Sequence, residues 1–85
     1  MVRGGGCILS NRIRVLRAEH KITQQDLAKA VGVSRQTIIS IEKGNYTPSL
    51  VLGFEIANAF NVGIDEVFQY EKKEEGLSGK NYWGL

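Results

Sequence analysis

The sequence predicts a small all-α domain of five short helices, and three observations lead to this fold class. Apolar residues recur at three- and four-residue intervals, which is the spacing of one face of a helix. Serine or threonine stands at the start of several of these stretches, and glycine closes two of them, as is typical of helix ends. The chain of 85 residues is long enough for one domain with a thin core and too short for two.

Two segments outside the helices are expected to form a small antiparallel ribbon. Residues 1–6 contain three consecutive glycines and are expected to be flexible. The segment CILS at 7–10 and the segment FQYE at 68–71 are short and rich in residues that favour strands. We expect them to pair with each other and to lean on the helices, because a two-stranded ribbon is not stable alone.

The first helix is predicted over residues 10–21, SNRIRVLRAEHK. Ser10 or Asn11 is expected to cap its N-terminus, since both side chains accept hydrogen bonds from free backbone N–H groups. Ile13 and Leu16 share one face, which is expected to be buried.

The next two helices carry the same local signals in succession. Thr23 is a good N-cap for the second helix, and Asp26 three residues later completes a capping box. Gly32 is expected to end that helix in the left-handed conformation, and Ser34 to cap the third, which we predict over residues 34–43. The residues expected to face the core are Leu27, Ala28, Val31, Ile38 and Ile41.

A fourth helix is predicted over SLVLGFEIANAFN, residues 49–61, and a short fifth over GIDEVF, residues 63–68. Gly53 in the middle of the fourth helix costs about 1 kcal/mol relative to alanine, unless a neighbouring residue needs the space. The two expected apolar stripes of this helix are Leu50, Phe54, Ala57 and, beside them, Leu52, Ile56, Phe60. We place the domain at residues 7–71 and expect residues 72–85 to form a polar tail.

Composition excludes several classes of protein. Apolar residues make up 42% of the chain, which is enough for a folded domain. One cysteine and one histidine cannot form an internal disulfide or a zinc site, so no metal, cofactor or small-molecule ligand is expected. No apolar run approaches the ~18 residues of a membrane-spanning helix, and we expect a cytoplasmic protein. Cys7 is interpreted as an inert edge-strand residue and Tyr82 and Trp83 as part of a loose tail; a redox switch and a partner-binding motif are the alternatives.

Charge is divided unevenly along the chain. Residues 1–48 contain eight Lys/Arg and three Asp/Glu, a net charge of +5, whereas residues 49–85 contain three and six, a net charge of −3. A basic first half indicates a surface that meets a polyanion.

The outer side of the third helix carries groups of the kind that recognise DNA. The residues on this side and its flank are Arg35, Gln36, Ile39, Ser40 and Lys43. Their polar groups are those that bind base edges and phosphates, and Ile39 is suited to a thymine methyl group. Lys43 lies about 10 Å further along the axis than the first turn, so it is expected to hold a phosphate. We therefore expect this helix to enter a major groove while the preceding helix braces the DNA backbone.

The chain resembles a known family, the Xre/Cro-type helix-turn-helix repressors of bacteria, archaea and phages. The resemblance is carried by LR at 16–17, TQQDLA at 23–28, VGVSRQTIISIEKG at 31–44, TPSL at 47–50 and IDEVF at 64–68. Members of one short subgroup carry a strand before the first helix and another after the fifth, where CILS and FQYE stand here. The resemblance implies a compact five-helix, lambda-repressor-like domain. It also implies a transcriptional regulator, of the repressor class, that binds double-stranded operator DNA. Gly53 departs from the family, which usually has alanine there.

The resemblance also implies roles for individual residues. By match to the family's motif, Gln24 would contact a phosphate, and Ser34 the DNA backbone. Arg35, Gln36 and Ser40 would face the groove.

Two opposite charges, Arg17 and Glu42, lie on otherwise apolar stripes. Members of the family pair these positions, so we expect an ion pair that links the first helix to the third; the alternative is that both side chains extend to water.

The family usually dimerises, and a homodimer through the C-terminal half is expected here, because a single small unit makes few base contacts. The candidate contact residues are Phe54, Phe60, Val67 and Phe68.

Three other functions fit the sequence less well. An enzyme is disfavoured, because the sequence has no catalytic residue set and no phosphate-binding glycine loop followed by Lys-Ser/Thr. A protein-interaction module of the same fold without DNA binding is the main alternative, and the basic outer side of the third helix argues against it. RNA binding is weaker, since no aromatic stacking surface accompanies the basic residues.

Overall fold

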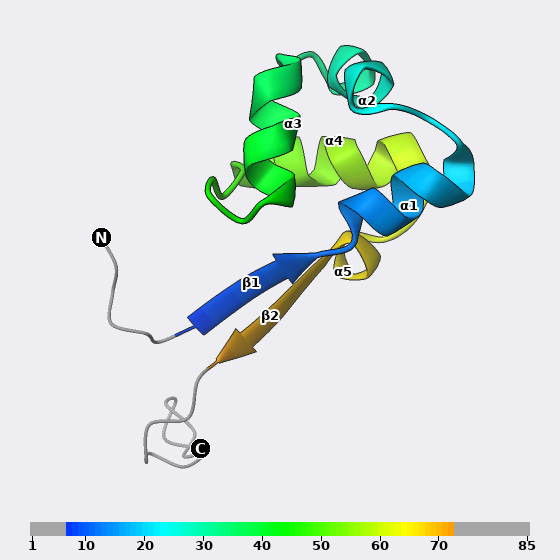
Figure 1. Cartoon of the computed structure of the whole chain (residues 1–85). Coiled ribbons are helices and arrows are strands. Elements are labelled where there is room, and N and C mark those ends of the chain that lie inside the picture. The colour runs from blue at the N-terminus through cyan, green and yellow to red at the C-terminus, as the bar shows by residue number, and fades with distance from the viewer. Residues whose placement is uncertain (1–6, 73–85) are drawn as a thin grey trace.

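The computed structural model describes residues 7–72. In chain order its elements are β1 Cys7–Asn11, α1 Ile13–His20, α2 Gln24–Val31, α3 Arg35–Glu42, α4 Leu50–Phe60, α5 Ile64–Val67 and β2 Phe68–Lys72 (Figure 1). The predicted five-helix class and the predicted ribbon are both confirmed. Residues 1–6, and all of the expected tail beyond Lys72, including Tyr82 and Trp83, lie outside the described residues. None of the helices within residues 7–72 is long and apolar enough to cross a membrane.

The ribbon of β1 and β2 projects from the helical body (Figure 1). Its antiparallel register is Cys7–Lys72, Ile8–Glu71, Leu9–Tyr70, Ser10–Gln69 and Asn11–Phe68. At its base, the backbone N–H of Arg12 donates to the carbonyl of Val67 at 2.9 Å. The side-chain amide of Asn11 donates to the carbonyl of Ile41 at 3.0 Å. These bonds join the ribbon to α5 and α3, and they supply support that a free two-stranded ribbon lacks.

The helix ends in the middle of the chain follow from local side-chain chemistry. The Thr23 hydroxyl accepts from the Asp26 N–H at 3.0 Å, and the Asp26 carboxylate accepts from the Thr23 N–H at 2.9 Å, so the predicted capping box is confirmed. Hydrogen bonding of the carboxylate to the Thr23 backbone N–H, and secondly to the Thr23 side chain, lowers the pKa of Asp26 from its usual value of 3.8. Ser34 caps α3 by accepting from the Thr37 N–H at 3.1 Å. Gly32 ends α2 with φ at 79°, as expected for a glycine in the left-handed region.

The start of α1 differs from the prediction. The helix begins at Ile13 rather than at residue 10, and its N-cap, Arg12, makes no side-chain cap hydrogen bond. Ser10 and Asn11 are instead the last residues of β1. The Asn11 side-chain oxygen still accepts from the Ile13 N–H at 3.1 Å, so it serves the helix end from outside the N-cap position.

The core lies between the helices and is entirely apolar among the described residues. Its fully buried members are Ile13, Leu16, Leu27, Ala28, Ile38, Ile41, Ile56, Ala57, Phe60 and Val67. Gly53 is buried where α4 meets α5, and a Cβ atom added there would lie 3.2 Å from Cδ1 of Ile64. Glycine in place of alanine fits this close approach, because Ile64 would have to shift by a few tenths of an ångström to admit a methyl group.

The apolar face of α4 differs from the predicted stripes. Leu50 is 71% exposed and Phe54 is 49% exposed, so of the first predicted stripe only Ala57, at 2% exposed, lies in the core. The helix is rotated so that Gly53, and not either of these side chains, faces its neighbour. Phe60 and Val67, which were suggested for a partner surface, are 1% and 0% exposed and belong to the core. That suggestion was wrong for these two residues.

Candidate nucleic-acid interface

The helix α3 is anchored by one side and open on the other. Ile38 and Ile41 are 0% and 1% exposed, and they fix the rotation of the helix against the core. Arg35 and Gln36, in the first turn, are exposed, as is Lys43 at the C-cap. The rotation that buries the two isoleucines thus determines which side chains remain free to meet a partner.

A shallow hollow runs along this open side of α3. It is open to solvent, has a volume of about 370 Å³, and is lined by Ser34, Gln36, Thr37, Ser40, Asn45 and Tyr46. All six side chains are uncharged, and each carries a hydrogen-bonding group. The hollow is therefore suited to a partner that offers both donors and acceptors, as the edges of base pairs do.

Three of the six residues, Thr37, Asn45 and Tyr46, were missed by the sequence reasoning. Asn45 and Tyr46 follow α3 in a turn that starts at Gly44, where φ is 81°. The left-handed glycine carries the chain back beside the helix, so that the two residues extend its open side. The glycine was a usable signal, although it indicates a turn without giving the direction of the chain beyond it.

The remaining predicted contact residues are divided between two environments. Ile39 and Ser40 are partly buried, so each presents only part of its surface. Gln24, in the first turn of α2, is also partly buried, and its side-chain amide donates to Oε1 of Glu42 at 3.0 Å. The structure thus places Gln24 at the junction of α2 and α3, beside the ion pair rather than in the hollow.

The predicted ion pair between Arg17 and Glu42 forms and is largely shielded from water. Nε of Arg17 donates to Oε2 of Glu42 at 2.7 Å, and Nη2 donates to Oε1 at 3.3 Å. The Glu42 side chain is 1% exposed and that of Arg17 is 16% exposed. Arg17 also donates through Nη1 to the carbonyl of Ile22 at 3.2 Å. This bidentate pair links α1 to α3 and holds the turn that precedes α2.

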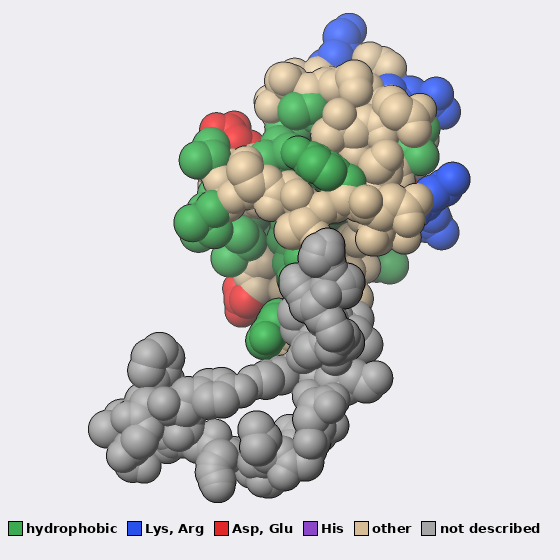
Figure 2. Space-filling model, turned by 90° about the vertical axis from the view of Figure 1, so that its left-hand side faces the viewer, with side chains coloured by type: hydrophobic (Ala, Val, Ile, Leu, Met, Phe, Trp, Pro, Cys, Tyr) green, Lys and Arg blue, Asp and Glu red, His purple; other side chains and the backbone are tan. Residues whose placement is uncertain are grey.

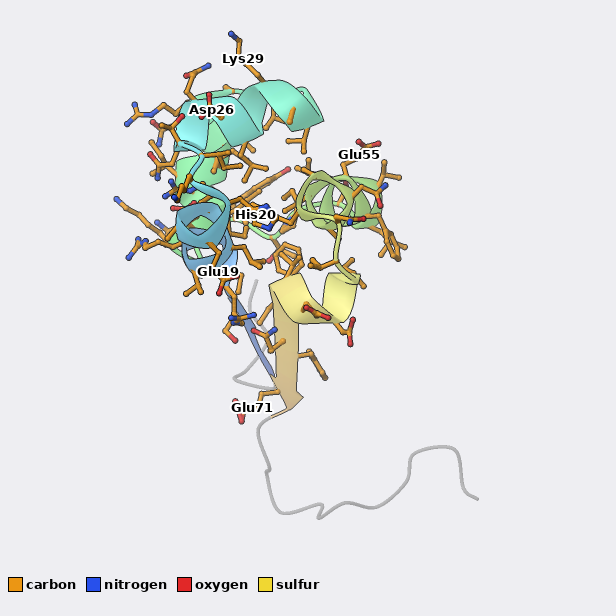
Figure 3. The ribbon with its side chains drawn as sticks, turned by 90° about the vertical axis from the view of Figure 1, so that its right-hand side faces the viewer. Glu19, His20, Asp26, Lys29, Glu55 and Glu71 are labelled. Atoms are coloured by element: carbon orange, nitrogen blue, oxygen red, sulfur yellow. The ribbon has the colours of Figure 1, made fainter. Side chains whose placement is uncertain are left out.

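The basic side chains lie mainly on a different side of the molecule from the acidic ones and from much of the exposed hydrophobic surface. In Figure 2 the Lys and Arg side chains lie at the top and right, whereas the acidic side chains and much of the exposed hydrophobic surface lie at the left. The side of α4 that carries Glu55 faces away from α1 (Figure 3). The exposed hydrophobic residues of α4 are Leu50, Val51 and Phe54. A polyanion would therefore be attracted to the side that carries the basic residues.

Comparison with known proteins gives consistent matches. Residues 13–67 match the model of the family described as helix-turn-helix. A protein of Methanocaldococcus jannaschii, described as an uncharacterised HTH-type transcriptional regulator, is 56% identical over 66 residues, which are 78% of this chain and 100% of that protein.

Solved structures agree with these sequence matches. A proposed DNA-binding protein from Bacteroides fragilis has a TM-score of 0.67 and 31% identity, and the match covers 73% of this chain and 100% of that one. A restriction-modification controller protein from Aeromonas hydrophila has a TM-score of 0.62 and 31% identity, over 65% of this chain and 83% of that one.

Proposed function

The chain belongs to the helix-turn-helix family, and from this premise we propose that it is a sequence-specific DNA-binding transcriptional regulator that places α3 in a major groove. The observation that carries the proposal is the open side of α3, where an uncharged polar hollow is flanked by exposed basic side chains. An α-helix fits the width of a major groove, and the preceding helix then crosses the backbone.

We assign base recognition to the first turn of α3. Arg35 and Gln36 are exposed there, at the end of the helix that enters the groove. Guanidinium and amide groups make bidentate bonds to guanine and adenine respectively, so these two residues can distinguish bases. Ser40, one turn later in the same hollow, offers a hydroxyl to either kind of base, and the exposed part of Ile39 is suited to a thymine methyl group.

We assign backbone contacts to Gln24, Ser34 and Lys43. Lys43 is exposed at the far end of α3 and carries a charge suited to a phosphate. Ser34 lines the hollow at its near end, although its hydroxyl also serves Thr37. Gln24 uses one amide N–H for Glu42, and its second N–H remains for a phosphate.

The regulator would act as a homodimer that represses by occupying its operator in the cytoplasm. Leu50, Val51 and Phe54 are exposed apolar side chains on α4. Pairing of these side chains between two copies would leave both α3 helices free. The two half-sites would then lie about 34–36 Å apart, which is one turn of DNA. This is a binding role and involves no catalysis.

The proposal is tested by selecting fragments of genomic DNA on the immobilised protein and sequencing what is retained. We expect the retained fragments to share a short sequence. Their affinity for the protein should fall as the salt concentration rises, because each contacted phosphate adds to the salt dependence of binding. A folded protein that retains no fragment above the level of uncoated resin at low salt would contradict the proposal. That result would favour the alternative of a protein-interaction module.

A further inference from the structure

The junction of α1, α2 and α3 brings together polar and charged side chains that lie outside the hollow. We propose that Arg14 and Gln24 together bind one backbone phosphate of the DNA, and that Glu42 is a positioning residue that orients Gln24 for this contact. The inference rests on the proposed function and assigns a phosphate site to Arg14, which neither the sequence reasoning nor the motif indicated.

The distances bring the two donors within reach of one phosphate. The amide nitrogen of Gln24 lies 3.0 Å from Oε1 of Glu42, and Nε of Arg14 lies 4.0 Å from the same oxygen. The two nitrogens are therefore at most about 7 Å apart. Each donor bonds to a phosphate oxygen at about 2.7–3.2 Å, so donors with this separation can contact the same phosphate group.

The charges at the junction leave one positive charge for the phosphate. Glu42 is neutralised by Arg17 at 2.7 Å, and its side chain is only 1% exposed, so its carboxylate does not present a negative surface. Arg14 lies further from Glu42, at 4.0 Å, and its side chain is 74% exposed. A guanidinium held at that distance and mostly in water is free to pair with an external anion.

The orientation of Gln24 is fixed by the chemistry of its partner. A carboxylate only accepts hydrogen bonds, so the amide must turn its NH2 group, not its oxygen, toward Glu42. The second N–H of that same group then lies on the side away from Glu42. A phosphate is also an acceptor, and the orientation that Glu42 imposes is the one that a phosphate requires.

The first test compares Arg14→Ala with a matched control, Lys29→Ala. Both variants remove one exposed cation, but Lys29 points outward at the far end of α2, away from α1 (Figure 3). Binding to a fluorescent duplex of mixed sequence is measured across a salt series, which requires no knowledge of the operator. Arg14→Ala should reduce the slope of log K against log salt by about 0.9 and weaken binding about fivefold near 0.15 M salt. Lys29→Ala should leave the slope unchanged.

Equal slopes for the two variants, with the wild type binding the duplex normally, would overturn the phosphate site and leave the proposed function intact. Failure of the wild type to bind any duplex would instead contradict the proposed function itself. Circular dichroism and thermal unfolding of each variant establish that the fold is retained.

The second test addresses Glu42 with a double-mutant cycle. Gln24→Ala and Glu42→Gln are made singly and together, and duplex binding is measured at a temperature where all three variants are folded. If Glu42 acts by orienting Gln24, Glu42→Gln should weaken binding in the wild-type background but have little further effect once Gln24 is alanine. Additive losses in binding would show that Glu42 does not position Gln24.

Discussion

Replacing Arg17 by methionine should destabilise the domain severely, because it leaves the Glu42 carboxylate without its main partner. Methionine keeps much of the length of the arginine stem and removes the charge. The Glu42 side chain is 1% exposed, and the other groups near it are the Gln24 amide at 3.0 Å and Arg14 at 4.0 Å. Breaking a buried pair by removing one partner typically costs about 3–5 kcal/mol.

The cost is large compared with the stability of so small a domain. Stabilities of about 0.05–0.15 kcal/mol per residue imply about 4–13 kcal/mol for a chain of this length. At about 4–8 °C per kcal/mol, the midpoint of thermal unfolding should fall by at least about 12 °C. Urea unfolding followed by circular dichroism at pH 7 measures the free energy directly.

Two further variants identify the cause of the loss. Arg14→Met removes a charge that is 74% exposed and should cost less than about 1 kcal/mol. The double variant Arg17→Met with Glu42→Leu removes both charges and should recover much of the loss, because the penalty comes from the carboxylate that remains. If Arg17→Met costs less than about 1 kcal/mol, or the double variant is less stable than the single one, the reasoning about this pair is refuted.

Three more predictions concern the helix ends, the α4 packing and the outer surface of α4. Gly53→Ala should change the free energy of unfolding by less than about 1 kcal/mol, since the gain in helix propensity offsets the strain of the 3.2 Å approach to Ile64. Gly53→Leu should lower the free energy of unfolding by about 1–3 kcal/mol, because the larger side chain does not fit there. Equal urea midpoints for the two variants would count against this packing. The pKa of Asp26 is lowered on folding from 3.8. The stability that its carboxylate contributes is therefore fully present above pH 3.8 and is lost as the pH falls through the pKa of the folded state. The stability of Asp26→Asn should therefore fall less steeply than that of wild type below pH 3.8, as followed by urea unfolding at several pH values, and parallel curves would contradict the linkage. Phe54→Glu should convert a dimer to a folded monomer in sedimentation at micromolar concentration, whereas a wild type that sediments as a monomer with and without DNA would rule out the proposed pairing.

Much of the fold was predictable because its signals are local. Thr23 and Asp26 lie three residues apart and bond to each other, so the start of α2 is determined within one turn of the chain. Ser34 acts in the same way on α3. The pairing of Arg17 with Glu42 was also predictable, since a charge on an apolar stripe is destabilising unless an opposite charge pairs with it.

The features that were missed depend on contacts between distant parts of the chain. Leu50 and Phe54 match the helical period of a predicted stripe but stay exposed, because α4 turns Gly53, Ile56, Ala57 and Phe60 toward the core. The start of α1 was misplaced because β1 continues through Asn11, and strand pairing is set by β2 rather than by the local sequence. The position of Arg14 beside Gln24 likewise requires three helices to meet at one point.

The most direct test of the proposal that α3 reads the base sequence compares a residue at its start, Gln36, with one at its end, Lys43. Binding of Gln36→Ala and Lys43→Ala is measured on a genomically selected duplex and on its scrambled counterpart across a salt series. Gln36→Ala should cost about 1–3 kcal/mol on the selected duplex and little on the scrambled one, because an amide that reads a base edge contributes only where that base is present. Lys43→Ala should weaken both similarly and lower the salt slope by about one. If Gln36→Ala weakens both duplexes equally, α3 does not read the sequence as proposed.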